Sequence, residues 1–144
     1  MAGGPRFRTR IVIGCALVCW LVGACGEGTA GLIGRTWRWT ALTEDAPLAH
    51  SEVSTPDLYT LTFSDDGSFR AQADCNTVAG TFVTDGHEIT ISPGPSTLVA
   101  CPEGSLADRY VSLLHTVSTF SVDGDDLTLR FEDDAGKMMF AAAV

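Results

Sequence analysis

Most of this 144-residue chain consists of short segments in which apolar and polar residues alternate, separated by an acidic residue followed by glycine. Residues 59–63 and 69–75 alternate in this way on either side of Asp66-Gly67. A period of two on both sides of an Asp-Gly pair predicts a β-hairpin. The pattern recurs around Asp85-Gly86 and Asp123-Gly124, and a last turn is predicted at Ala135-Gly136. Each hairpin has one apolar face, so these faces must pack on one another or on a helix.

One segment has the periodicity of a helix. Apolar residues recur every three to four positions from Leu106 to Val117, including Tyr110 and Leu114. Ser105 precedes them at the N-cap position, with an acidic residue three positions later. This pattern predicts a helix of three to four turns beginning after Ser105.

The remaining segments complete the expected domain. Trp37 and Trp39 lie on one face of a short alternating segment whose other face carries Arg38, which predicts a first strand with both tryptophans in the core. The proline-containing segments 43–57 and 92–96 are predicted to be irregular. The length of the chain is that of one domain.

The N-terminal residues have the composition of an export signal. Three arginines within the first ten residues are followed by 14 residues, 11–24, without a charge. A helix of that length spans about 21 Å, short of the roughly 30 Å hydrocarbon core, so the segment favours a signal peptide, with a permanent transmembrane anchor as the alternative. The stretch ends in Leu-Val-Gly-Ala-Cys25, which resembles a bacterial lipobox. That resemblance implies cleavage between residues 24 and 25 and lipid on Cys25, with residues 25–35 forming the lipidated cysteine and a flexible tether. The alternative is a buried or unpaired cysteine at the end of an ordinary signal peptide.

The charge of the chain excludes some classes of function. It carries 9 Lys and Arg against 18 Asp and Glu, a net charge of -9, and loss of the three signal arginines makes it more negative still. Such a chain has no basic patch for a phosphate backbone, so nucleic-acid binding is not expected. Anionic lipid head groups would repel this acidic domain unless the covalent lipid on Cys25 held it at the membrane. We therefore expect a lipid-anchored protein on the extracytoplasmic side of the cell membrane, in the periplasm or at the cell surface.

The number of cysteines indicates which of them can form a disulfide. Of five cysteines, two lie in the signal and Cys25 is assigned to the lipid, which leaves Cys75 and Cys101. An even remainder in an exported domain favours a disulfide. Free thiols, or a catalytic or metal-binding pair, are the alternatives, although zinc would need further ligands and a redox pair would favour a C-x-x-C motif.

Two short motifs resemble those of a known family. An Asp-Cys-Asn segment at 74–76 is followed by Gly80 and Phe82, and Thr-Leu-Val-Ala-Cys covers 97–101. Together with Thr36-Trp37 in the first strand, this order resembles the META domain, or HslJ-type heat-shock, family, whose members typically show Gly-Cys-Asn-x-x-x-Gly-x-Tyr and Thr-x-Met-Ala-Cys. The matching positions, to which we assign a structural role, are Trp37, Asn76, Gly80, Thr97 and Ala100.

The resemblance carries expectations for fold and function. It implies an α+β domain over residues 36–144, with a small antiparallel, partly barrel-like β-sheet of hairpins and one packed α-helix. It links the chain to heat-shock response, to tolerance of hydrophobic drugs and, for some members, to secretion or virulence. The family has no established catalytic residues, so none is transferred. Asn76 is expected to be a turn residue in left-handed geometry.

The titratable residues form no recognisable catalytic or metal motif. His50, His87 and His115 are far apart in sequence and outside any hydrolase or metal signature. The paired aspartates in the turns are too closely spaced to wrap a calcium ion and are what hairpin turns require. We therefore predict no catalytic residue, no metal and no cofactor.

An apolar surface is the remaining candidate for function. Trp37, Trp39, Tyr110 and Leu114 are expected either in the core or at an open mouth of the sheet that would take an acyl chain or a hydrophobic drug. The chain is thus interpreted as a non-enzymatic binding or interaction module in envelope stress or hydrophobic-compound tolerance. Its partner would be a hydrophobic small molecule or another envelope protein. The alternative is an inhibitor that uses the acidic segment 43–57, or a pilotin-like accessory of an exported protein.

Overall fold

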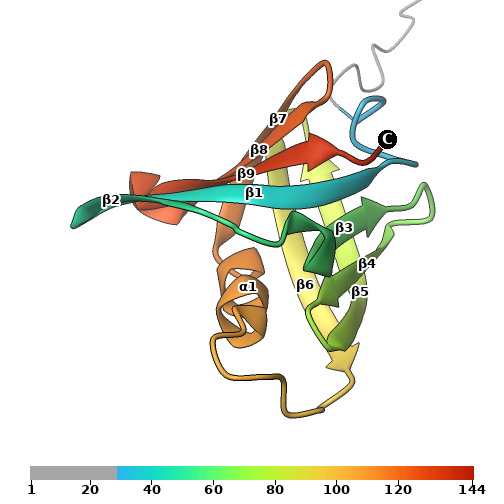
Figure 1. The fold of residues 1–144 in the computed structure, drawn as a ribbon. Helices are drawn as coiled ribbons and strands as arrows, with labels where there is room; N and C mark the ends of the chain where they lie inside the picture. The colour runs from blue at the N-terminus through green and yellow to red at the C-terminus, as the bar shows by residue number, and fades with distance from the viewer. Residues whose placement is uncertain (1–28) are drawn as a thin grey trace, which may run out of the picture.

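A computed structural model of the chain describes residues 29–144. This part of the chain contains nine strands and one α-helix (Figure 1). The strands are β1 (Thr36–Asp45), β2 (Leu48–Glu52), β3 (Tyr59–Phe63), β4 (Ser68–Ala73), β5 (Asn76–Asp85), β6 (Glu88–Ser96), β7 (Val117–Asp123), β8 (Asp126–Phe131) and β9 (Gly136–Ala142). The helix is α1 (Ala107–Leu114), and two short 3-10 turns are η1 (Pro56–Leu58) and η2 (Glu132–Asp134).

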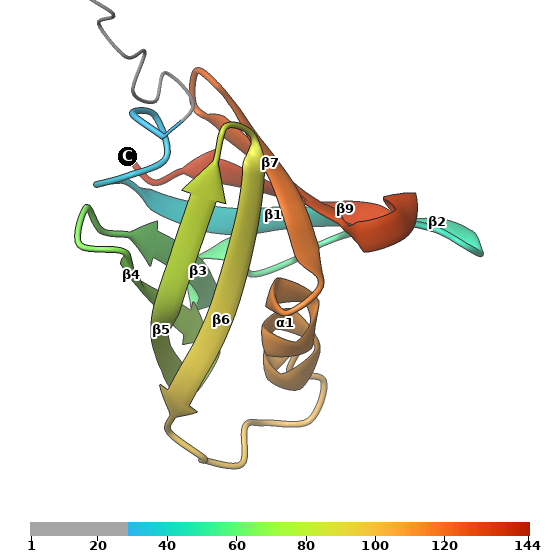
Figure 2. The ribbon, with the colours of Figure 1, turned by 180° about the vertical axis from the view of Figure 1, so that it is seen from behind.

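The strands form one antiparallel sheet that closes on itself. Their order is β2-β1-β3-β4-β5-β6-β7-β8-β9, and β9 also pairs with β1. The strands from β1 and β3 to β9 therefore form a ring, from which β2 extends outward (Figures 1 and 2). The closure is irregular because β6 and β7 share a single residue pair, Glu88 with Thr119. The expected α+β class is confirmed, with a ring in place of a regular barrel.

Helix α1 lies beside β6, in the seam where β6 and β7 separate (Figure 2). Tyr110 and Leu114 on its inner face are fully buried. The ring of Tyr110 stacks on Trp39 with 5.2 Å between centroids, and its hydroxyl donates to the Thr60 carbonyl at 3.0 Å. The helix therefore closes the seam with an aromatic side chain whose one polar atom is satisfied.

The interior of the ring is one hydrophobic core. The inward positions of every hairpin and the inner face of α1 contribute to it. Its largest fully buried side chains are Trp37, Trp39, Tyr110, Phe63, Phe140, Leu32, Leu61, Ile89, Leu114, Leu127, Leu129 and Met138. The expectation that Trp37 and Trp39 point inward is confirmed.

The turns fall where the sequence predicts them. Gly67, Gly86 and Gly124 connect β3 to β4, β5 to β6 and β7 to β8 with φ of +82°, +60° and +61°. Side chains other than Asn and Asp are strained in that region, so glycine fixes the positions of these hairpins. At the first of them, the Ser68 hydroxyl and backbone N–H donate to Asp66, which lowers the pKa of its carboxyl.

The predicted helix is too long at both ends. Helix α1 has eight residues, about two turns, and its N-cap is Leu106 rather than Ser105. The Ser105 hydroxyl still accepts from the Ala107 N–H at 3.2 Å, and the Leu106 N–H donates to the Tyr59 hydroxyl at 2.8 Å, so the serine and a buried tyrosine together satisfy the start of the helix. At the other end, Val117 is the first residue of β7 and pairs with Phe131 of β8, in keeping with the preference of β-branched residues for strands.

Both segments predicted to be irregular contain strands. Within 43–57, β1 continues to Asp45 and pairs with β2. Most residues of β2 are exposed, so no apolar alternation marks it in the sequence. Segment 92–96 is the end of β6, where Pro93 and Pro95 lie beyond the single pair with β7. An edge without a neighbouring strand tolerates the missing N–H groups of proline.

Candidate functional site

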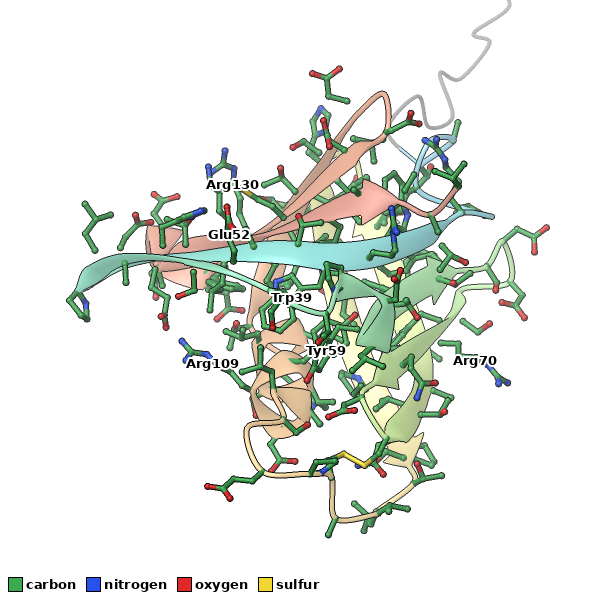
Figure 3. The ribbon with its side chains drawn as sticks, viewed as in Figure 1. Trp39, Glu52, Tyr59, Arg70, Arg109 and Arg130 are labelled. Atoms are coloured by element: carbon green, nitrogen blue, oxygen red, sulfur yellow. A yellow bond between two sulfur atoms is a disulfide. The ribbon has the colours of Figure 1, made fainter. Side chains whose placement is uncertain are left out.

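A disulfide joins the two motif segments at one end of the ring. Cys75, just before β5, is bonded to Cys101, which lies 26 positions later in the connection from β6 to α1. The predicted disulfide is thus present in the structure. It ties down residues 97–106, the disulfide loop, whose sulfur bridge lies below α1 in Figure 3.

Asn76 holds the disulfide loop with its side-chain amide. Its Oδ1 accepts from the Val99 N–H at 2.8 Å, and its Nδ2 donates to the Val99 carbonyl at 2.9 Å. The amide therefore pairs with both backbone groups of Val99, as a residue of a neighbouring strand would. The expectation that Asn76 is a left-handed turn residue is wrong. Asp74, two positions earlier, has the left-handed conformation at φ 56°, and Asn76 is the first residue of β5.

Thr97 extends the pairing of β5 and β6 into the same loop. Its N–H donates to the Thr77 carbonyl at 3.1 Å, and its Oγ1 accepts from the Thr77 N–H at 3.0 Å. The hydroxyl then donates to Asn76 Oδ1 at 3.1 Å. Both motif segments therefore contribute to one hydrogen-bonded unit.

Two other motif positions serve packing. A Cβ at Gly80 would lie 2.3 Å from the Ser92 carbonyl oxygen and 2.6 Å from the Phe69 ring, so this position admits no side chain. Trp37 is fully buried and its indole N–H donates to the Leu32 carbonyl at 3.0 Å. Both residues therefore have a structural role inside the ring.

The disulfide loop carries two exposed aliphatic side chains. Leu98 is 94% exposed and Val99 is 59% exposed. Their exposure is not caused by a loose loop, because the backbone of Val99 is fixed by Asn76 and that of Thr97 by β5. Neither side chain was identified as a candidate from the sequence. The available signal was a pair of aliphatic residues in a segment bounded by prolines, where no strand alternation accounts for them.

Two open grooves lie on either side of Asn76. The first, about 360 Å³, lies between the disulfide loop and α1, and the second, about 300 Å³, lies under Ala100 and Cys101. They share Asn76, Ala107 and Asp108, so we treat them as two halves of one feature, the α1 trough. Further lining residues of the first half are Ala73, Val78, Ser96, Thr97, Leu98, Val111, Ser112 and His115.

The predicted apolar binding face is wrong as a surface. Trp37, Trp39, Tyr110 and Leu114 are each no more than 1% exposed, because α1 covers the seam of the ring and Tyr110 stacks on Trp39. A depression of about 160 Å³ between β2 and α1 reaches the edge of Trp39, beside Arg109 (Figure 3). The large apolar side chains that are exposed within residues 29–144 lie elsewhere, and two of them, Leu98 and Val99, are adjacent on the disulfide loop; the others are Leu48, Leu58, Val83 and Val144.

The titratable groups of residues 29–144 do not converge. No three His, Cys, Asp or Glu side chains within that range are placed to hold a metal ion. His50 lies on β2, His87 in the turn after β5, and His115 at the end of α1. Burial raises the pKa of Tyr110 above its usual range, so its phenol acts as a neutral donor. Within residues 29–144, the three histidines thus lie on separate elements of the fold.

The expected signal and anchor are not covered by the structure. Residues 1–24 and Cys25 lie outside the described residues. From residue 29 onward, no helix is long and apolar enough to cross a bilayer.

Comparisons with known proteins agree with this architecture. A family model of the META domain matches residues 30–144. A DUF4847 family protein from Bacteroides vulgatus has a similar structure at 17% identity, with a TM-score of 0.59 over 76% of this chain and 93% of that one. A protein from Burkholderia xenovorans is similar at 19% identity, with a TM-score of 0.65 over 78% of this chain and 84% of that one. At such identities the likeness shows the fold alone. No curated protein matches the sequence.

Proposed function

Because the chain belongs to the META domain family, we propose that it is a non-enzymatic binding module, held on the extracytoplasmic face of the cell membrane by lipid on Cys25. The observation that carries the binding function is the exposed Leu98–Val99 pair beside the α1 trough. Its cellular role would be tolerance of envelope stress or of hydrophobic compounds, as the family resemblance implies.

The rigidity of the disulfide loop supports a binding role. Exposed aliphatic side chains cost free energy in water, and a chain that holds them in place has less conformational entropy to lose when they are covered. Here the Cys75–Cys101 bond and the amide of Asn76 fix the backbone that carries Leu98 and Val99. The disulfide loop is therefore preorganised for binding.

The proposed anchor gives the domain an orientation. Thr29 follows Cys25 by four residues, so the link between them spans at most about 14 Å. The start of the described chain packs near the β7–β8 turn, where Arg35 donates to the Gly124 carbonyl at 2.8 Å. Figures 1 and 2 show this end of the ring opposite the disulfide loop. Lipid on Cys25 would thus keep the β7–β8 turn near the bilayer and present the α1 trough away from it.

A second candidate function, an inhibitor or pilotin-like accessory, is favoured by the β1–β2 hairpin. It projects from the ring (Figure 1), with Leu48 at its tip 81% exposed. A projecting hairpin can enter a cleft or add to the sheet of another protein. In that case the contact residues would lie on β2 instead of the disulfide loop.

The test uses full-length protein extracted from its own membranes in a mild nonionic detergent. Native mass spectrometry should show loss of residues 1–24 and a diacylglycerol-modified Cys25, and Cys25→Ala should carry no lipid. An uncharged alkyl diazirine, activated by light, should crosslink to the disulfide loop and α1. Leu98→Ser should reduce that crosslinking, whereas Leu48→Ser should not.

Each outcome bears on one part of the proposal. An unlipidated Cys25 would refute the anchor, and crosslinks spread evenly over the surface would refute the binding site. Crosslinking that depends on Leu48 and not on Leu98 would favour the hairpin candidate.

A further inference from the structure

We propose that the α1 trough receives an extended, cationic amphipathic peptide segment of another envelope protein, a proposal that rests on the binding function above. Three observations lead to it: the shape of the trough, the free backbone groups of the disulfide loop, and the charge at the junction of the two grooves.

The shape favours a chain segment over a compact small molecule. Both halves of the trough are open to solvent, whereas sites for small ligands usually enclose most of the ligand. Asp108 of α1 and His115, the C-cap residue that follows it, line the first half seven residues apart, which corresponds to about 10 Å along the helix axis. About three extended residues fit that length, and the second half continues beyond Asp108.

The disulfide loop offers backbone groups to such a segment. Within residues 29–144, the N–H and carbonyl groups of Leu98 and Ala100 have no hydrogen-bond partner, whereas those of Val99 between them are bound by Asn76. Alternate free residues are what an added extended chain requires, because every second residue of a strand pairs with a given neighbour. The side chain of Leu98 would then pack against an apolar residue of the segment.

The charge at the junction favours a cation. Asp108 lines both halves of the trough, and neither half is lined by Lys or Arg. Within residues 29–144, its carboxylate makes no ion pair. A carboxylate in the first turn of a helix is common by itself, but here it lies between two grooves of an acidic protein. Lys or Arg beside apolar residues therefore complements the trough, and an anionic segment would be repelled.

The position of the trough favours a protein over a lipid. The trough lies at the end of the ring opposite the start of the described chain (Figures 1 and 2). On the proposed anchor, that end faces away from the bilayer. An acyl chain would therefore have to leave its own membrane to reach Leu98.

The experiment uses full-length lipidated protein in phosphatidylcholine nanodiscs, with empty nanodiscs as the blank. Three labelled hexapeptides alternate Leu with Lys, with Ser or with Glu, and their binding is followed by fluorescence anisotropy. The Lys peptide should bind most tightly and the Glu peptide least. Asp108→Asn should weaken the Lys peptide about three- to fivefold and leave the Ser peptide unchanged, since an exposed ion pair contributes little more than that. Leu98→Ser should weaken all peptides that bind.

Asp133→Asn is the matched control, because it removes the same charge from an exposed residue of η2, at a left-handed position that Asn tolerates. Equal weakening by Asp133→Asn and Asp108→Asn would overturn the proposal, since only net charge would then matter. Equal affinity for the Lys and Ser peptides, or displacement of the Lys peptide by a lysophospholipid with no effect of Asp108→Asn, would also overturn it. If no peptide binds while the diazirine still labels the disulfide loop, the peptide proposal fails and the binding function stands. If neither binds, both fail.

Discussion

Replacement of Asn76, the only asparagine of the chain, tests whether its amide holds the disulfide loop. Asn76→Ala removes three hydrogen bonds of 2.8 to 3.1 Å, two to the backbone of Val99 and one from the Thr97 hydroxyl, together with a weak one of 3.4 Å from Nδ2 to Cys101 Sγ. Each of the first three contributes about 1 kcal/mol net, and water replaces part of that at a half-exposed site, so the expected loss is about 2 kcal/mol. For a domain of this size that corresponds to a melting temperature lower by roughly 8 °C.

Asn76→Asp separates the donor from the acceptor. It keeps an oxygen to accept from the Val99 N–H but places a second oxygen where Nδ2 now lies, 2.9 Å from the Val99 carbonyl. We expect a loss of about 1.5–2.5 kcal/mol at pH 7. A protonated carboxyl regains a donor, and the repulsion in the folded state raises the pKa of this carboxyl above its unfolded value, so the deficit should shrink as the pH falls from neutral toward about 4 and change no further below that.

Urea unfolding with the disulfide intact measures both variants. Thr81→Ala on β5 is the control, because its exposed hydroxyl has no hydrogen-bond partner within the described residues. If Asn76→Ala costs no more than the control, the amide contributes nothing and the account of the loop is wrong. A deficit of Asn76→Asp that does not depend on pH would show that the donor to the Val99 carbonyl is not the cause.

The structure leads to three further predictions. Cys75→Ser and Cys101→Ser should each reduce the free energy of unfolding, measured in urea, by about 3.5 kcal/mol. The double variant should be no less stable than either single variant, because either change opens the same covalent loop. Additive losses in the double variant would argue against the disulfide. Gly80→Ala should cost about 2–3 kcal/mol in the same assay because its Cβ meets a β6 carbonyl, and a neutral result would contradict that close approach. Tyr110→Phe should cost about 1 kcal/mol at pH 8 through the lost bond to Thr60. Because the pKa of Tyr110 is raised on folding, its contribution is present below about pH 10 and falls at higher pH, so the deficit of the Phe variant should diminish there.

Local sequence patterns predict the parts of the fold that depend on local geometry. The glycines of the three Asp-Gly turns have positive φ, and the Asp-Gly pairs in the sequence predict this conformation. The alternation around them places Leu61, Phe63 and Phe69 inside, as the structure confirms. The pairing of the two remaining cysteines follows from counting in the same way.

Features that depend on tertiary contacts are not visible in the same patterns. The start of α1 is satisfied in part by the predicted local contact, in which the Ser105 hydroxyl accepts from the Ala107 N–H, and in part by the hydroxyl of Tyr59, which lies 47 positions from Leu106 and which no local signal reveals. Strand β2 is exposed and carries no apolar alternation, because its only requirement is to pair with β1. The role of Asn76 depends on a loop more than twenty positions later, which no local rule for turns can reveal.

The interior of the ring is filled by side chains, so a binding site is expected on segments outside it. A closed sheet of about eight strands has an interior just wide enough for side chains to fill it or to hold one small ligand. Here Trp37, Trp39 and Tyr110 occupy that interior and are held by hydrogen bonds to Leu32, Ala41 and Thr60, so opening it would break satisfied polar contacts as well as apolar ones. Under the proposed binding function, contact with a partner would therefore fall to segments outside the core. Among these, the disulfide loop combines exposed aliphatic side chains, free backbone groups and a fixed conformation.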